Sequence, residues 1–187
     1  MIGGVAHATA VELEVGLEEI RRSPADGGRV ELIVRRPAEN EREVVAEATL
    51  DPVEGLVGDA WRSRGSRHTD DGSAHLAQQV TMMNARVAAL LAGGPDRWQL
   101  AGDQLYVDLD LSEANLPPGT RLGIGSAVVE VTDQPHRGCK KFAARFGPEA
   151  TRFVNSPVGR QLRLRGMNAH VVVGGTIRVG DVIHRVT

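Results

Sequence analysis

The spacing of apolar residues changes along the chain and predicts a few helices among many short strands. Between Leu13 and Ile20 the apolar residues recur at helical spacing, and Thr9 with Glu12 matches a capping box. A first helix is therefore expected over about residues 10–22.

Two further helices are indicated by their end signals. Asn84 is a favourable N-cap, and Gly93 follows the last apolar residue of the segment, which predicts a helix between them. Pro148 stands where the first residue of a helix would stand, so the sequence PEATRFVNS is expected to form one helix.

Alternation of apolar and polar residues predicts the strands. The sequences RVELIVRRP and EVVAEATL alternate on either side of the turn-forming PAENE, as the two arms of a hairpin would. Periodicity then vanishes between Gly58 and Gln79, and such a long irregular segment is usually functional or disordered. Further short strands are expected in QVTMM, QLYVDLDL, RLGIGSAVVEVT, MNAHVVV, TIRV and DVIHRV.

This succession of elements indicates the class of fold. Many short strands with glycine-rich turns and a few inserted helices are typical of a mainly β, barrel-like single domain. Regular alternation of strand and helix is missing, and no G-x-G-x-x-G motif follows a strand, which argues against a dinucleotide-binding fold.

Composition narrows the possible settings and partners. The 187 residues carry a net charge of −2 and are only 3% aromatic, so a nucleic-acid partner is not expected. No run of apolar residues is long enough for a membrane span, and the N-terminus lacks the features of a secretory signal. The single cysteine excludes an intramolecular disulfide and a zinc site built from several cysteines. We therefore expect a cytoplasmic protein in which this thiol stays reduced.

The cysteine, Cys139, lies in the most basic part of the chain. From His136 to Arg165 there are eight basic residues and one acidic residue, a net charge of +7, which leaves −9 for the rest of the sequence. Nearby cations favour the thiolate form, which is the nucleophile and the ligand for soft metals. The alternative is that Cys139 simply packs, because free cysteines are often buried.

Other candidate residues allow two interpretations each. His136 and Cys139 could bind zinc together with His68 and His75, although their spacing is not that of a known zinc site. Gly58 and Asp59 form either an ordinary turn or a glycine-rich approach to an anion. Arg165 and Gly166 precede a strand, where the guanidinium could bind a planar anion.

Several motifs in order resemble those of the MOSC domains, the family named after the C-terminal domain of molybdenum cofactor sulfurase. They are EGLVGD, QVTMMN, the long section ending in RLGIGSAVVEVT, a cysteine after a proline, and RGMNAHVVVGGTIRVGDVI. The resemblance covers about Val44 to Val186 and suggests a MOSC domain at 41–187, with residues 1–40 adding a helix and a strand packed on the barrel.

The resemblance implies a function in molybdenum cofactor chemistry. Cys139 would be the catalytic residue, either as a ligand of molybdenum or as a carrier of sulfur in a persulfide, in sulfur transfer or in redox detoxification of small molecules. The anionic molybdopterin would be bound by a set of basic and glycine residues, namely Gly58, Asp59, Arg137, Lys140, Lys141, Arg145, Arg165 and Gly166.

The resemblance leaves the reaction and the partners open. A molybdenum-dependent oxidoreductase and a sulfurtransferase-like protein are both compatible with it, and a reductase or a sulfur-donor protein is a candidate partner. No aminotransferase-like domain is present, so pyridoxal phosphate is not expected. The alternative function is a non-catalytic anion-binding module that uses the basic segment 136–165, with Cys139 only packing.

Overall fold

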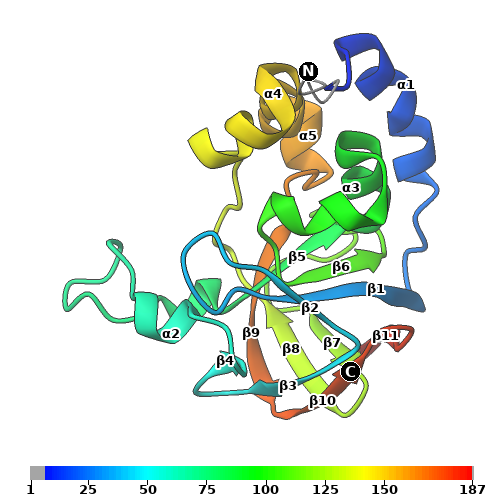
Figure 1. The fold of residues 1–187 in the computed structure, drawn as a ribbon. Helices are drawn as coiled ribbons and strands as arrows, with labels where there is room; N and C mark the ends of the chain where they lie inside the picture. The colour runs from blue at the N-terminus through cyan, green and yellow to red at the C-terminus, as the bar shows by residue number, and fades with distance from the viewer. Residues whose placement is uncertain (1–6, 187) are drawn as a thin grey trace.

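Seven strands close into a barrel because the two ends of one sheet meet. In the computed structural model, which describes residues 7–186, the order is β11-β7-β8-β9-β5-β6-β1, and β1 pairs with β11 to complete the ring (Figure 1). All neighbouring barrel strands are antiparallel except β5 and β6. The barrel strands are β1 (Gly28–Arg35), β5 (Val80–Asn84), β6 (Leu105–Asp108), β7 (Arg121–Ile124), β8 (Ala127–Val131), β9 (Met167–Val173) and β11 (Val182–Val186).

The remaining strands lie beside the barrel. β2 (Glu43–Val45) extends the sheet by pairing with β1, which confirms the predicted hairpin only for the start of EVVAEATL, because the rest of that sequence forms β3. β3 (Glu47–Asp51), β4 (Gly55–Leu56) and β10 (Gly175–Arg178) form a separate three-stranded sheet.

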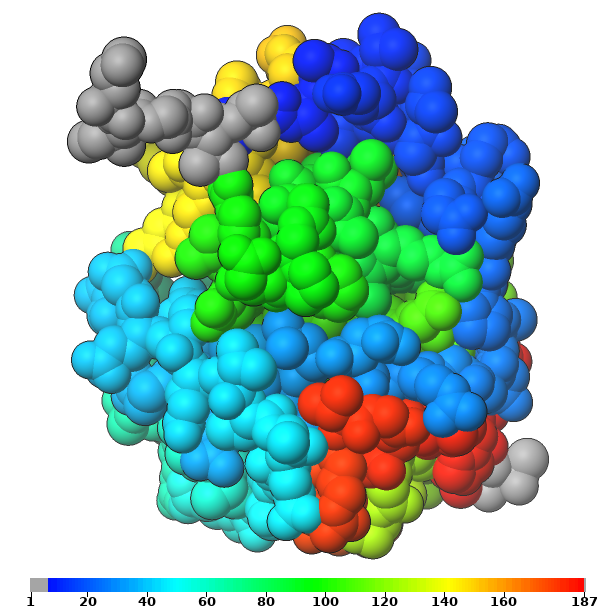
Figure 2. Space-filling model, turned by 45° about the vertical axis from the view of Figure 1, so that its right-hand side comes forward, coloured from blue at the N-terminus to red at the C-terminus, as the bar shows by residue number. Residues whose placement is uncertain are grey.

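The longer helices gather on one side of the barrel. In Figure 2, α1 in blue and the green segment of α3 and η2 form one continuous cap above the strands. The helices are α1 (Ala10–Arg21), α2 (Trp61–Arg64), α3 (Ala85–Ala92), α4 (Lys140–Asn155) and α5 (Pro157–Gln161), with the short 3-10 helices η1 (Leu76–Gln78) and η2 (Pro95–Ala101). Among residues 7–186, none of the helices has both the length and the apolar character needed to cross a bilayer.

Alternation along the strands creates two apolar cores. Met82 and Leu105 point into the barrel, whereas their neighbours Met83 and Tyr106 belong to the core under the helices. Leu13 of α1 joins this second core, and all five side chains are almost completely buried. Residues facing opposite sides of one strand thus hold the barrel and the helical layer together.

The end signals in the sequence work as predicted. Thr9 and Glu12 form the capping box of α1, and Asn84 caps α3 by accepting from the Arg86 N–H. The α4 helix is interrupted at Gly147, whose φ is 87°, so that Pro148 begins a new helical segment as expected. The mainly β class with inserted helices is confirmed.

Two expectations are refined by the topology. The division of the chain at residue 40 stays a prediction, but β1 is a barrel strand that pairs with both β6 and β11. The aperiodic segment 58–79 contains α2 and η1, separated by turns.

Barrel closure depends on close packing at Gly28, the first residue of β1. A Cβ atom there would overlap the carbonyl oxygen of Asp108 and press on Leu109. We expect Gly28→Ala to lower the free energy of unfolding by about 1–3 kcal/mol, the usual cost of overpacking. Urea unfolding would measure this, with Glu31→Ala at an exposed position of the same strand as the control. Equal stability of the two variants would contradict this account of closure.

Candidate functional site

Cys139 is exposed at the point where the chain passes from the barrel to the helices. It is the N-cap residue of α4, with extended backbone angles (φ −110°, ψ 179°) and no capping hydrogen bond from its side chain. The segment that leads to it leaves the end of β8 and rises to α4 (Figure 1). The interpretation of Cys139 as a packed core residue is therefore wrong.

The backbone just before the cysteine is held by one side chain. Asn155 Oδ1 accepts a hydrogen bond from the Gly138 N–H (3.0 Å), and its Nδ2 donates to the Gly138 carbonyl (3.1 Å). This pairing resembles one rung of a β-ladder and fixes both polar groups of Gly138. Asn155, the last residue of α4, thus positions Gly138, which directly precedes the cysteine at the start of the same helix.

The cysteine segment lines two cavities that share no lining residue. His136 and Arg137 line a cavity of about 210 Å³, whereas Lys141 lines another of about 500 Å³. The larger of the two is bordered by cationic side chains, and we call it the basic cavity; its charged lining residues are Arg36, Glu39, Arg42, Arg64 and Lys141.

Positive charge in the basic cavity exceeds the charge available to neutralise it. Burial lowers the pKa of Arg42, and the charges of Arg145 and Arg36 lower it further. Burial also lowers the pKa of Arg64, again with a contribution from Arg36. Lys141 is paired with Glu39 at 2.6 Å, and both of these side chains are exposed. Crowded cations of this kind indicate a site for an anion.

Arg36 differs from its neighbours because its charge is already balanced. Its Nε and Nη2 donate to the two carboxylate oxygens of Asp59 (2.8 and 3.0 Å), and Nη1 donates to the Gly102 carbonyl (2.9 Å). Asp59 also accepts from two backbone N–H groups, those of Arg36 and Trp61. The side chain of Asp59 is fully buried and holds Arg36 in place. Gly58 precedes it with a φ of 87°, as the turn requires.

A second buried ion pair lies behind the smaller cavity. Arg165 Nη1 is 2.5 Å from Asp103 Oδ2, and Nη2 donates to the Ala101 carbonyl (2.9 Å). Its guanidinium also lies 5.0 Å from the centre of the Phe142 ring. Burial raises the pKa of Asp103, and the Arg165 charge opposes that shift. Arg165 is thus engaged inside the protein.

His136 faces the same carboxylate. Its Nδ1 lies 3.4 Å from Asp103 Oδ1. Burial lowers the pKa of His136 well below its usual value, and the charges of Arg165 and Arg36 act in the same direction. The ring packs close to Gly166, where a side chain would overlap the Met82 carbonyl oxygen. Gly166 therefore allows the strands and the imidazole to approach each other.

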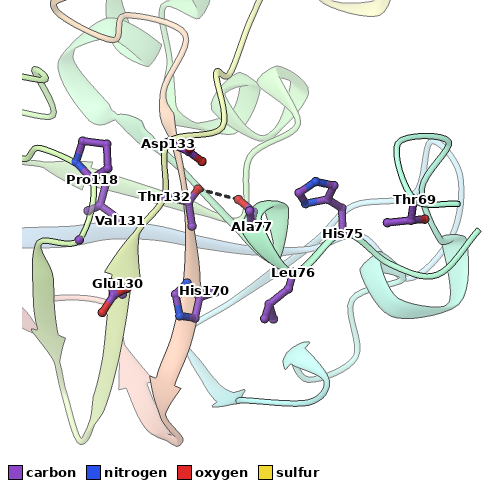
Figure 3. A pocket seen from close by; sticks show the side chains of 11 residues that line it. Thr69, His75, Leu76, Ala77, Pro118, Glu130, Val131, Thr132, Asp133 and His170 are labelled. Atoms are coloured by element: carbon purple, nitrogen blue, oxygen red, sulfur yellow. Dashed lines mark hydrogen bonds between the residues drawn. The ribbon is translucent and has the colours of Figure 1, made fainter.

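A third cavity of about 680 Å³ continues from the smaller one. Figure 3 shows it between the ends of β8 and β9 and the η1 segment, with His75 and His170 among its lining residues. The hydroxyl group of Thr132 donates to the Ala77 carbonyl (2.6 Å) and joins the two sides.

Comparison with known proteins identifies the family. The model of the MOSC domain matches residues 64–184. The chain belongs to the MOSC domain family. That family is associated in general with molybdenum cofactor binding and sulfur transfer. No curated protein matches the sequence.

Solved structures share the fold of this MOSC domain. The YuaD protein from Bacillus subtilis is 16% identical, with a TM-score of 0.62 over 86% of this chain and 97% of that one. YiiM from Escherichia coli is 18% identical (TM-score 0.55; 85% and 70% covered), and YiiM from Geobacillus stearothermophilus is 17% identical (TM-score 0.57; 86% and 75% covered). At this level of identity, the likeness concerns the fold alone.

The MOSC structure separates the residues that the sequence grouped together. Lys141 borders the basic cavity, and Arg137 borders the smaller one. Arg145 donates to the Leu100 carbonyl (2.7 Å) close to Arg42, whereas Lys140 is exposed and lines neither cavity. Asp59 and Arg165 are buried in ion pairs. Whether these residues contact a cofactor stays a prediction.

Sequence reasoning missed three cations and proposed one site that does not form. Arg36, Arg42 and Arg64 border the basic cavity although they lie outside the basic segment. The pair of arginines before Pro37 and the sequence WRSR were the available signals. Within the part of the chain that the structure describes, no group of three or more His, Cys, Asp or Glu residues could hold a metal ion, so the zinc site is wrong.

Asn155 offers a direct test of how the cysteine segment is positioned. We expect Asn155→Ala to lower the free energy of unfolding by about 1–3 kcal/mol, because two partly buried hydrogen bonds are lost. Amide hydrogen exchange at Gly138 should become faster. Asn155→Asp is the matched control, since it keeps the acceptor for the Gly138 N–H. Unchanged protection of Gly138 in Asn155→Ala would contradict the proposed positioning.

The lowered pKa of His136 predicts a pH dependence of stability. Below the usual histidine pKa of about 6.5, the unfolded chain gains a proton on this residue that the folded chain does not. Relative to His136→Gln, the wild-type protein should therefore lose up to about 1.4 kcal/mol per pH unit between about pH 6.5 and the lower pKa of the folded state. Urea unfolding of both proteins at neutral and mildly acidic pH would measure the difference. Parallel stability curves would show that the folded imidazole titrates normally.

Proposed function

We propose that this MOSC protein binds a molybdenum–pterin cofactor in the basic cavity, with Cys139 as the ligand of molybdenum or the carrier of a persulfide. The observation that carries the proposal is the excess of cationic side chains in a cavity bordered by the same segment that exposes the only thiol. The family association supports the same class of ligand.

The residues present suit the chemistry of this cofactor. Its phosphate is an anion, and guanidinium groups bind phosphates through paired hydrogen bonds. Arg42 and Arg64 are the candidates for that contact, since neither forms an ion pair within residues 7–186. The cavity volume of about 500 Å³ lies in the usual range for small-molecule sites.

The two other cations would have different roles. Arg36 is fixed by Asp59 and the Gly102 carbonyl, so it supplies a charge whose position does not change. Lys141 is held only by an exposed ion pair with Glu39, which contributes little to stability and can be exchanged for a ligand.

Cys139 would supply a thiolate ligand for the molybdenum of this cofactor. Thiolates are favoured ligands of soft metals and also the form that accepts sulfur. When bound, the molybdenum centre supplies two-electron redox chemistry and transfer of an oxo or sulfido group. The segment fixed by Asn155 keeps the thiol exposed two residues before Lys141, which lines the cavity, and a reductase or a sulfur-donor protein could reach it there.

Metal and pterin analysis of selected variants tests this proposal. Protein purified from a host that makes molybdopterin should contain molybdenum and pterin in similar amounts. Cys139→Ser should keep pterin, because the cations remain. Its molybdenum content per pterin should fall if Cys139 is a ligand and stay unchanged if Cys139 carries a persulfide. The double variant Arg42→Gln/Arg64→Gln should lose both by at least about tenfold, the effect expected when charge-assisted hydrogen bonds are removed.

The control replaces two arginines that lie far from the cavity. Arg21→Gln/Arg22→Gln removes the same charge from the exposed end of α1, where both residues form only surface ion pairs. This variant should retain the cofactor. Wild-type protein without molybdenum and pterin, or equal losses in the two double variants, would contradict the proposal. Mass spectrometry of Cys139 would reveal an added sulfur atom if the residue carries persulfide.

A further inference from the structure

Two buried polar atoms face each other behind the smaller cavity and have no other partner. His136 Nδ1 and Asp103 Oδ1 are 3.4 Å apart, and neither forms a hydrogen bond to any residue in the range 7–186. Buried polar atoms are rarely left unpaired. A small turn of the imidazole would let an Nδ1–H donate to Oδ1 and satisfy both atoms. Because Arg165 favours the ionised form of Asp103, this contact selects the tautomer with its proton on Nδ1.

The carboxylate in this pair cannot turn away from the histidine. Asp103 is fully buried, and its other oxygen is bound to Arg165 at 2.5 Å. Arg165 is in turn fixed by the Ala101 carbonyl and by the Phe142 ring. Asp103 therefore presents Oδ1 to His136 in a constant direction.

The other ring nitrogen of His136 is left for a ligand. The side chain retains 17% of its exposed area and lines the cavity of about 210 Å³. Nδ1 is buried, whereas Nε2 keeps some contact with solvent. Nε2 has no hydrogen-bond partner within the described chain. With the proton on Nδ1, Nε2 is an acceptor that faces the cavity.

We propose that this cavity is a ligand subsite in which His136 Nε2 accepts a hydrogen bond from an O–H or N–H group of a small organic molecule. The charged groups that surround the imidazole are Asp103, Arg165 and Arg36 on the protein side, and Arg137, Arg160, Arg163, Asp133 and Glu113 around the cavity. Burial and the charges of Arg165 and Arg36 disfavour the protonated imidazole. His136 is therefore uncharged and can act as an acceptor.

The adjoining cavity indicates the rest of the ligand. The cavities of about 210 and 680 Å³ share Pro118, Thr132 and Asp133, so one molecule can extend from one into the other. Leu76 and Val131 contribute apolar surface to the larger one (Figure 3). The favoured ligand has an apolar body and a polar end with a hydrogen-bond donor.

This subsite and the basic cavity are separate and share no lining residue. His136 and Arg137 border the first, and Lys141 borders the second. The assignment of its ligand as the substrate of a molybdenum centre rests on the proposed function. The subsite itself does not, and cofactor-free protein can therefore be used to test it.

Nitrogen NMR of the histidine side chains in the wild-type protein gives the first test. We expect His136 at neutral pH to carry its proton on Nδ1 and to show an unprotonated Nε2. A proton on Nε2, or a doubly protonated ring, would overturn the proposal. This measurement requires no variant and no ligand.

Phenol and anisole provide a matched pair of probes for the acceptor. Both have the same apolar ring, but only phenol can donate a hydrogen bond. Titrations followed by the His136 ring signals should give about 3- to 10-fold tighter binding of phenol, the range expected for one hydrogen bond. Equal affinity of the two probes, or no binding of either, would overturn the proposal.

Two variants connect that preference to His136. In His136→Phe the preference for phenol should disappear, because the acceptor is lost while a ring remains; binding there is followed by the signals of the probes. His184→Phe, at an exposed position of β11, should behave as the wild type. A preference that survives in a folded His136→Phe would overturn the role of Nε2. Failure of these tests would leave cofactor binding intact, and loss of cofactor would leave these results unchanged.

Discussion

The turn at Ala101–Asp103 holds both sides of the candidate site in place. Arg36 donates to the carbonyl of Gly102, while Arg165 donates to the Ala101 carbonyl and pairs with Asp103. Both guanidinium groups are buried, and removing one partner from such a pair typically costs about 3–5 kcal/mol. The turn is thus the common anchor of the basic cavity and of the cavity beside His136.

The same turn also determines which cations remain available. Gly102 has a φ of 93°, and a Cβ atom at this residue would lie 3.7 Å from Arg42 Nη2 and 3.8 Å from Arg145 Nη1. Arg42 and Arg145 therefore both lie close to the backbone of this residue. Arg36 and Arg165 are neutralised by buried carboxylates, whereas Arg42 has no such partner in the described chain. The two buried ion pairs thus fix the walls of the cavities, and the positive charge of Arg42 is left without a carboxylate beside it.

The sequence predicts the elements of this fold better than it predicts the site. Alternating apolar residues and the caps at Thr9 and Asn84 depend on local interactions, and the structure confirms them.

A net charge counted along the sequence, by contrast, does not show which charges are neutralised. Arg165 is paired with Asp103, and Lys141 with Glu39, across more than 60 residues in each case. Arg36, Arg42 and Arg64 lie in the part of the chain with a net charge of −9, yet they surround the cavity with the most crowded positive charge. Pairing of β1 with β6 brings Arg36, the residue after β1, beside the 101–103 turn that leads into β6.

The position of Cys139 follows from the passage between the two layers of the fold. Its segment leaves the barrel after β8 and enters the helical layer at α4. Residues of this segment line both the smaller cavity and the basic cavity. Asn155 fixes the backbone there, and Phe142, one turn into α4, anchors the helix on the Arg165 guanidinium. The segment that carries the thiol therefore lines two cavities of different character. Lys141 borders the cationic one, and His136 and Arg137 border the one that contains the neutral imidazole.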